Sequence, residues 1–521
     1  MEDLSKRLST LTPAKLELLA QRLRKECGVK LQGQVIPQRP KSETRLPLSL
    51  AQERLWFLDK FERDKSVYNI PRALRLSGTL SIVALDQSFG EIVNRHEVLR
   101  TTFKEIDGVP MQVIAKAVPF KLPVVDLSRL SVEQRENEVT RLAIADTQTA
   151  FDLTRGPLIR ASLLRLDENE YVILFTLHHI ISDAWSTGVI VRELVTLYKA
   201  FSQGEASPLP SLPIQYADFA RWQHQWMEGD RLEEHLAYWK RQLGGASNVL
   251  KLPADKPQPE ALSYDGARQS IVLPKGRTEL VKAFCKREKV TLFTTLLAAF
   301  KVLLHFYSGQ RDILVGTPAV NRSRRETEDL IGFFINTIVL RTDLSGNPTF
   351  LQLLGRVREV ALGAYAHQDL PFDKVVKVLQ PARTLEQTPL FQVAFLVHNA
   401  PLPPIEVPGL SVSQVEIGPI KMPYAMVMHA TDSAQGLILA VEYKTDLFSP
   451  AAISRVLTHY EEVLNSVTAR PEVTLRELGD ALAIVDKHQQ VETNRALSEI
   501  RLRTFKQMKR RTIRAAELVA D

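Results

Sequence analysis

Helical and β-strand patterns alternate along this chain, and the alternation limits the folds that are open to it. Within residues 46–242, apolar residues recur at helical spacing in three segments, 84–96, 132–150 and 188–202, and short β-branched runs such as Tyr171–Leu177 lie between them. Strands that alternate with helices pack as layers in which the helices cover a sheet. The pattern therefore predicts a layered α/β lobe.

A proline-rich, polar stretch, Asn248–Gly266, follows and predicts a crossing between two lobes. Beyond it we expect a helix over 291–307, strands at 313–316 and 335–341, and helices that begin at Phe350 and Ser449. No sequence repeat relates the two halves, so they are similar only in their class of fold. The chain has 521 residues, 45% of them apolar, which is enough for two or more packing units.

The two ends differ from the body. Thr12 and Pro13 predict the start of a short amphipathic helix, and the turn-forming residues up to Arg45 predict a linker that lets this leader move. The core pattern fades after about Leu478. We therefore divide the chain into a leader (1–45), a first lobe (46–245), a second lobe (246–475) and a basic helical tail (476–521).

The positive charge is concentrated in that tail. The chain carries a net charge of +7, and the segment from Arg495 to Arg514 holds eight basic residues against one acid, Glu499, so the rest of the chain is neutral. A neutral body argues against nucleic acid as the main partner. Residues 494–521 could be a solvated terminal helix, or could dock an acidic partner by electrostatic attraction.

Cysteine content and hydropathy give the expected compartment. Cys27 and Cys285 are too few for a disulfide framework and too far apart for a metal knuckle, so we expect the cytoplasm. No 18 apolar residues run together, and the start lacks a signal-type apolar core, so we expect no contact with a membrane. His96-Glu97 begins like a zinc-protease motif, but Arg100 stands where the second histidine is required, so we expect no metal.

The sharpest chemical signal is a histidine pair, His178 and His179, directly after the apolar run YVILFTL. Successive strand residues face opposite sides, so at most one of the two can face a cleft. Asp183 follows four residues later and could orient a ring or hold the loop by pairing with a buried arginine. The chain has neither a GxxxxGK phosphate loop nor a GxSxG nucleophile turn, which favours acid–base chemistry without a covalent enzyme intermediate.

Seven segments, taken in order, identify a family. They are SLAQERLWFL (49–58), RHEVLRTTF (95–103), HHIISDAWS (178–186), YADFARW (216–222), IGFFINTIVLR (331–341), HQDLPFD (367–373) and TPLFQV (388–393). Together they resemble the core motifs of the condensation domains of nonribosomal peptide synthetases, over about residues 46–475. The first and last segments most resemble the subtype that joins an L-configured donor to an L-configured acceptor.

The resemblance implies an α/β fold with two lobes like chloramphenicol acetyltransferase, set in a V as a pseudo-dimer around a central active-site tunnel. It implies that donor and acceptor enter as thioesters on the phosphopantetheine arms of carrier proteins, with no cofactor bound to the enzyme itself. We expect a monomer that forms an amide bond. The start at Met1 and the basic tail favour a free-standing protein rather than an excised domain.

The resemblance also assigns roles to the histidine loop. His179 is the expected catalytic residue, which takes the proton of the attacking amine or positions that amine, and the two possibilities stay open. His178 is expected to brace the loop through hydrogen bonds. Asp183 is expected to form a structural ion pair, with Arg95 as the first candidate partner. Backbone N–H groups that follow His179 are expected to stabilise the tetrahedral intermediate.

Further residues are expected around this centre. Arg100, Trp185 and Ser186 should support it, and Asn336 should lie on the opposite wall and help hold the two lobes together. Ala184 replaces a more usual glycine, so this position should not need a positive φ.

The segment Met422–Met426 departs from the family pattern because an acid expected near the acceptor is absent. This makes Tyr424, Ala425 and Met426 candidates for the acceptor side of the tunnel. The departure reflects either drift in a tunnel wall or an acceptor other than an ordinary α-amino acid.

Two other functions stay open. The same fold could form an ester or amide with a free alcohol or amine, because HHxxxD loops also occur in acyltransferases that use coenzyme A. The domain could also be a non-catalytic gate that only recruits carriers, although the intact His179 speaks against this.

Overall fold

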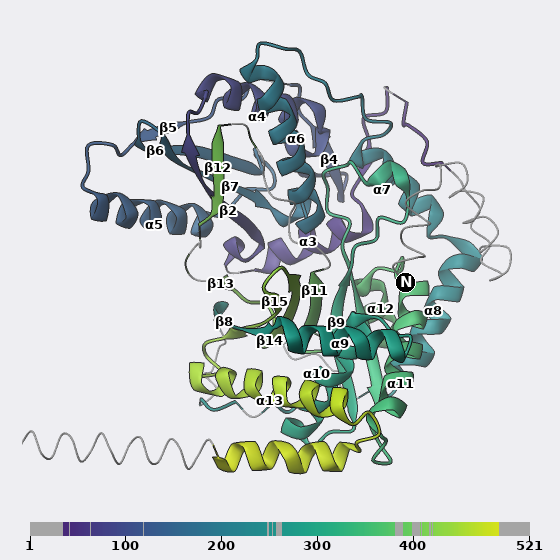
Figure 1. The fold of residues 1–521 in the computed structure, drawn as a ribbon. Helices are drawn as coiled ribbons and strands as arrows, with labels where there is room; N and C mark the ends of the chain where they lie inside the picture. The colour runs from purple at the N-terminus through teal and green to yellow at the C-terminus, as the bar shows by residue number, and fades with distance from the viewer. Residues whose placement is uncertain are drawn as a thin grey trace, which may run out of the picture.

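The computed structural model describes residues 35–488, except for 41, 63, 118, 247–248, 253, 257–262, 381–388, 399–406, 408, 416–417 and 419. This part of the chain is an α/β protein with two lobes, drawn one above the other in Figure 1. The leader helix predicted from Thr12 and the basic segment 494–521 lie outside the described residues.

The first lobe is built on a five-stranded sheet with the order β12-β2-β7-β6-β5. These strands are β2 (Asn69–Gly78), β5 (Val124–Asp126), β6 (Ile159–Asp167), β7 (Glu170–His178) and β12 (Leu410–Gln414). Helices α4 (Ile82–Arg95) and α6 (Ala184–Ser202) pack on one face, and α5 (Val132–Gln148) packs on the other. The predicted strand at 171–177 is confirmed as the central, fully buried part of β7.

Shorter elements complete this lobe. A three-stranded sheet has the order β1-β4-β3. Its strands and the remaining helices are β1 (Leu46–Pro47), β3 (Thr101–Ile106), β4 (Val109–Ile114), α3 (Leu50–Phe61), α7 (Tyr216–Trp226), η1 (Lys65–Tyr68), η2 (Glu97–Arg100) and η3 (His179–Ile181). Ser49 begins α3 through a reciprocal capping box with Gln52, and Ser131 begins α5 in the same way with Gln134.

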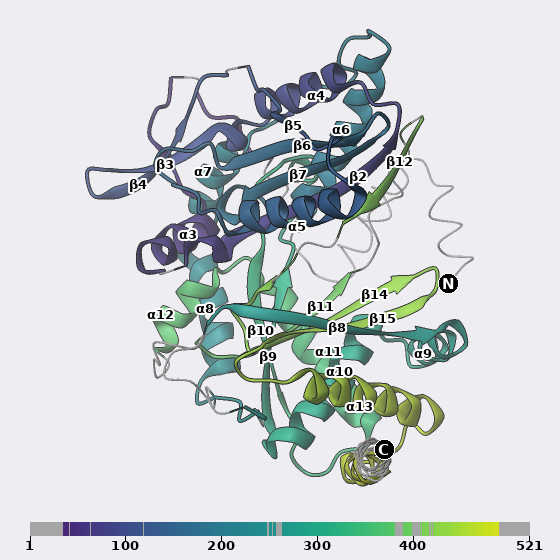
Figure 2. The same ribbon diagram turned by 90° about the vertical axis from the view of Figure 1, so that its left-hand side faces the viewer.

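The second lobe is built on a seven-stranded sheet with the order β10-β9-β11-β14-β15-β8-β13. Its strands are β8 (Asp265–Pro274), β9 (Asp312–Ala319), β10 (Asn336–Asp343), β11 (Val393–His398), β13 (Ile420–Lys421), β14 (Met426–Ser433) and β15 (Gly436–Lys444). Its helices are α8 (Gly229–Leu243), α9 (Lys275–Arg287), α10 (Leu292–Ser308), α11 (Phe350–Ala366), α12 (Phe372–Leu379) and α13 (Pro450–Ala469), with η4 (Arg325–Thr327). Helices α9, α10, α11 and α13 cover one face of the sheet, and the other face turns toward the first lobe (Figures 1 and 2).

The expected boundary at 245/246 assigns two elements, α8 and β12, to the wrong lobe. Helix α8 packs in the second lobe, where Trp239 donates its Nε1–H to the carbonyl of His367 at 3.1 Å. Strand β12 crosses to the first lobe and pairs antiparallel with β2. Gly78 permits this close approach, because a Cβ at its φ of +131° would lie 2.0 Å from the carbonyl oxygen of Gly409. Periodicity predicts the type of an element, but the sheet that a strand joins depends on distant partners.

The segments next to the two ends also differ from expectation. Residues 35–45 are not a free linker: Ile36 is 1% exposed in the first-lobe core, and Arg39 forms ion pairs with Glu97 and Asp218. The start of the expected tail is a helix over 475–488, whose Leu478 and Leu482 are buried in the second lobe.

Candidate active site

The histidine pair lies where β7 ends at the boundary between the lobes. His178 is the last residue of β7, and its ring is buried, with ring centroids of Tyr68 and Phe151 each 6.1 Å away. Its Nδ1 accepts the N–H of Ile180 at 3.1 Å. Burial lowers the pKa of His178 to about 3, so the ring is neutral and acts as an acceptor that holds the loop.

His179 begins η3 and is half-buried. Its Nδ1–H donates to the carbonyl oxygen of Ser182 at 2.8 Å, since a carbonyl can only accept. The ring of Phe333, from the segment before β10, contacts the imidazole edge-on with centroids 4.8 Å apart. Burial lowers the pKa of His179 against the opposing effects of the Ser182 hydrogen bond and the Asp183 carboxylate. The neutral ring therefore keeps its lone pair on Nε2.

Two backbone donors expected for the tetrahedral intermediate are already engaged. The N–H of Ile180 donates to His178, and the N–H of Ser182 donates to the carbonyl of His179 at 3.2 Å. The expectation that the groups following His179 stabilise an oxyanion is therefore wrong for these two.

Asp183 joins the two lobes. Its carboxylate caps α6 by accepting the N–H of Ser186 at 2.7 Å, and the hydroxyl of Ser186 lies 2.7 Å from the same oxygen. From the second-lobe side, Arg322 donates to Oδ1 at 3.2 Å and the N–H of Phe334 donates to Oδ2 at 3.1 Å. Asp183 is fully buried, and both of its carboxylate oxygens have hydrogen-bond donors, as a buried charge needs.

Arg95 is not the partner of Asp183, and this expectation is corrected. Arg95 pairs with Glu193 at 3.0 Å, and Glu193 also accepts from His96 at 2.8 Å. Glu193 lies ten residues beyond Asp183 along α6, about 15 Å away at the helical rise. The end of α4 therefore reaches the middle of α6 rather than its cap.

The remaining first-lobe candidates differ in what they contact. Trp185 donates its Nε1–H to the carbonyl of Glu328 at 2.8 Å, which is another bond between the lobes. Arg100 instead donates to the carbonyl of Ala115 within the first lobe. Ala184 is the first residue of α6 and is not among the residues with positive φ, as expected.

Asn336 has a different role from the expected one. Its Nδ2 donates at 2.6 Å to the carbonyls of both Gln368 and Leu370, and its Oδ1 accepts the N–H of Phe372 at 3.1 Å. All four residues belong to the second lobe. Asn336 therefore fixes the loop before α12 and does not bond the two lobes together.

The three acceptor-side candidates separate in the structure. Met426 is 3% exposed in the core under the helices of the second lobe, so its side chain is wrongly placed for a tunnel wall. Ala425 is held by its backbone, which bonds to Gln392 and Lys444. Tyr424 is partly buried and packs on Phe391, with ring centroids 5.4 Å apart.

Sequence reasoning missed four residues of this site: Arg322, Tyr216, Glu193 and Phe333. Tyr216 and Phe333 stand inside motifs that carried the family resemblance, so a signal existed for them. Arg322 is 139 residues from Asp183, and no local pattern connects the two.

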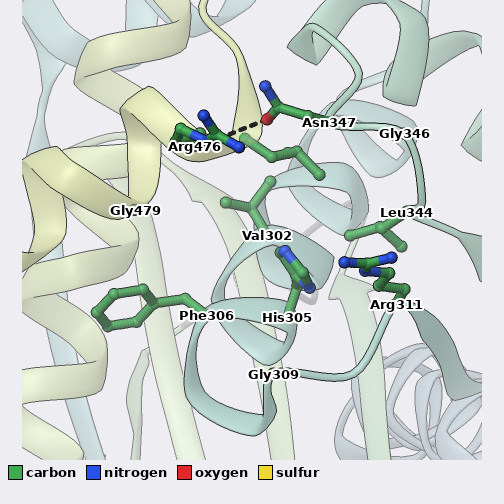
Figure 3. A pocket seen from close by; sticks show the side chains of 11 residues that line it. Val302, His305, Phe306, Gly309, Arg311, Leu344, Gly346, Asn347, Arg476 and Gly479 are labelled. Atoms are coloured by element: carbon green, nitrogen blue, oxygen red, sulfur yellow. Dashed lines mark hydrogen bonds between the residues drawn. The ribbon is translucent and has the colours of Figure 1, made fainter.

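The part of the chain that the structure describes contains no group of His, Cys, Asp and Glu side chains that could hold a metal ion. No single described helix is long and apolar enough to cross a membrane, although the bent pair α9 and α10 together has the length and composition. A pocket of about 520 Å³ lies at the C-terminal end of α10, with Arg311, Asn347 and Arg476 in its lining (Figure 3). It shares no residue with the histidine site.

The fold and the site together define a two-lobed α/β protein with a buried HHxxxD loop at the lobe boundary. The sequence matches the condensation-domain family over residues 42–484, and the chain belongs to that family. It is 48% identical over 428 residues to one of the proteins of the linear gramicidin synthase of Brevibacillus parabrevis, a match that covers 82% of this chain and 6% of that protein. The chain thus spans only a small part of such a synthase.

Two solved structures are similar along nearly their whole length. The X-domain from teicoplanin biosynthesis, also solved in complex with OxyB, has a TM-score of 0.78 and 27% identity, covering 85% of this chain and 99% of that one. SgcC5 from Streptomyces globisporus, in complex with (R)-(-)-1-(2-naphthyl)-1,2-ethanediol and sucrose, has a TM-score of 0.68 and 30% identity, covering 82% and 100%.

Proposed function

We propose that this domain transfers the acyl or peptidyl group of a carrier-bound thioester to the amine of a second carrier-bound substrate, in a tunnel between the lobes. The observation that carries the proposal is the state of His179. Its Nδ1 is engaged by Ser182, its pKa is lowered by burial, and its Nε2 lone pair is left as an acceptor. An imidazole in this state can bind or deprotonate an amine at neutral pH.

In the proposed reaction the amine nitrogen attacks the thioester carbonyl carbon, and the C–N bond forms as the C–S bond breaks. Nε2 of His179 accepts the proton that the nitrogen loses and returns it to the departing thiolate of the phosphopantetheine arm. Such assistance is typically worth about 10²–10⁴ in rate. His178 and Asp183 contribute by fixing the loop and the lobe boundary.

A second candidate is ester formation on a free alcohol. The observation that favours it is the SgcC5 structure, which was solved with a bound diol. The match covers all of the SgcC5 chain and 82% of this one. An alcohol loses its proton to the same Nε2 in the same geometry. A third candidate, a recruitment domain without catalysis, is favoured by the X-domain that was solved with OxyB.

Helix α3 carries two neighbouring aromatic side chains that are exposed. Phe57 and Phe61 are 60% and 71% exposed, and their ring centroids lie 4.8 Å apart. The same helix places Arg54 against Phe372 and Asp373 of the second lobe, so the pair lies where the lobes meet. Exposed apolar side chains that cluster in this way are typical of protein interaction sites. We propose this aromatic pair as a carrier-docking surface.

The experiment that separates these functions is intact-mass analysis of an acyl-loaded donor carrier mixed with candidate acceptors. Transfer to an aminoacyl carrier supports amide formation, and transfer only to a soluble alcohol supports the second candidate. No transfer, with carriers still bound, supports recruitment. The control variants are His179→Ala, which should abolish transfer, and His488→Ala, which should not. His488 is exposed at the end of the helix over 475–488.

A further inference from the structure

The segment Ile331–Phe334 reaches from the second lobe into the first and is held there by side chains rather than by a strand. Its backbone bonds are Ile331 N–H to Nδ1 of His96 (3.4 Å), Gly332 N–H to Oγ of Ser186 (3.0 Å), the hydroxyl of Tyr216 to the carbonyl of Phe333, and Phe334 N–H to Oδ2 of Asp183 (3.1 Å). All four first-lobe partners are buried. We call this arrangement the crossing clamp.

The clamp leaves little freedom of position. A Cβ at Gly332 would lie 2.0 Å from the ring of Tyr216, so the segment packs directly against that ring. His96 and Ser186 are fixed in turn, by Glu193 and by Asp183. Buried and mutually bonded groups of this kind hold one geometry, because leaving any of them unpaired is costly.

The two phenylalanines of the segment reach different neighbours. Phe334 packs into the first lobe against Tyr216 and Phe219, with centroids at 4.9 Å and 4.6 Å. Phe333 is 8% exposed and meets the imidazole of His179 at 4.8 Å and 66°. The crossing clamp therefore fixes the position of the Phe333 ring against the imidazole of His179.

We propose that Phe333 is a positioning residue for His179, through which the docking of the two lobes is transmitted to the reacting imidazole. This inference rests on the proposed function. The Ser182 carbonyl fixes one ring nitrogen, and Phe333 limits the tilt of the ring and excludes water from one side. A base held in this way points its free nitrogen in one direction, and misplacement by about 1 Å can cost about 10²-fold in rate. Asp183 then affects the reaction indirectly, by seating Phe333.

The test is a pair of matched truncations, Phe333→Ala and Phe219→Ala. Both remove a ring from the same core, but the Phe219 ring packs on Phe334 rather than on His179. Phe333→Ala should lower kcat for amide formation about 10- to 100-fold with little change in KM, and Phe333→Leu should recover part of the loss. Phe219→Ala should lower the unfolding temperature without that effect on kcat.

A second readout does not depend on turnover. In NMR titrations of labelled histidines, with the His179 signal assigned by its loss in His179→Gln, Phe333→Ala should raise the titration midpoint of His179 toward about 6.5 because the ring becomes hydrated. Phe219→Ala should leave that midpoint in place. An unchanged midpoint and kcat in Phe333→Ala would overturn the inference. A shifted midpoint in a protein that transfers no acyl group would support the contact and instead refute the proposed function.

Discussion

Arg322 of the second lobe donates through Nη2 to the carboxylate of Asp183, the cap of helix α6 in the first lobe, at 3.2 Å. Both side chains are buried, with 2% and 0% exposure. The aspartate of the HHxxxD loop thus joins the lobes, and it acts on the site through its bonds to Ser186 and Phe334. Stability and catalysis are coupled at this residue.

The first prediction concerns that ion pair. Asp183→Ala leaves a buried guanidinium without its counter-charge and should lower the free energy of unfolding by about 3–5 kcal/mol. The control is Asp329→Ala, because the Asp329–Arg192 pair crosses the same boundary but is exposed on both sides. It should cost at most about 1 kcal/mol in urea titrations. Equal losses in the two variants would refute the structural role of the buried pair.

The second prediction concerns Asn336, which fixes the loop before α12. Asn336→Ala removes the donor to two carbonyls and the acceptor of Phe372 and should cost about 2–3 kcal/mol. Hydrogen exchange should rise at the N–H groups of residues 368–370 and of Phe372. Asn336→Asp keeps an acceptor but sets a carboxylate oxygen against the two carbonyls, so exchange should rise in this variant too. Exchange as slow as in the wild type in either variant would contradict the assignment.

The third prediction concerns pH and His178. The folded-state pKa is about 3, below the unfolded value of about 6.5, so the unfolded chain binds an extra proton between these values. Stability should therefore fall as the pH drops below 6.5, by about 2 kcal/mol from this group at pH 5. His178→Asn, which keeps an acceptor for Ile180, should lose less stability between pH 7 and pH 5 than the wild type. The same loss in both proteins would show that His178 is not the group responsible.

The fourth prediction concerns the exposed aromatic pair on α3. The double variant Phe57→Ala/Phe61→Ala should raise the KM for a carrier protein about tenfold, because buried aromatic anchors dominate binding energy. Its unfolding temperature should change little, since both side chains are largely exposed. Val83→Ala serves as the control, because Val83 is 68% exposed but lies on α4, on the far side of the first lobe. An unchanged carrier KM would remove this surface from the proposal.

Sequence reasoning performed best where the information is local. The helices at 84–96, 132–150 and 291–307 are found as α4, α5 and α10 within a few residues, because periodicity and capping residues lie inside each element. Helix α6 begins four residues earlier than predicted, because Asp183 also serves as its cap.

The failures share a different cause. Strand β12, the partner of Arg95, the side-chain direction of Met426 and the contacts of Asn336 all depend on residues far away in the chain. Two acidic residues of α6 were available to Arg95: Asp183, the cap of the helix, and Glu193 in its middle. Only the packing of α4 on α6 decides which of the two forms the ion pair. Met426 shows the limit for strands: a shift of one position moves a side chain from one face of the sheet to the other.

The most direct test of the proposed role of His179 is the single-turnover rate of amide formation from pre-loaded carriers, compared between wild type and His179→Ala at pH 7. This rate should fall about 10²–10⁴-fold with the unfolding temperature retained, because the half-buried ring serves the chemistry rather than the core. A rate equal to that of the wild type would contradict it.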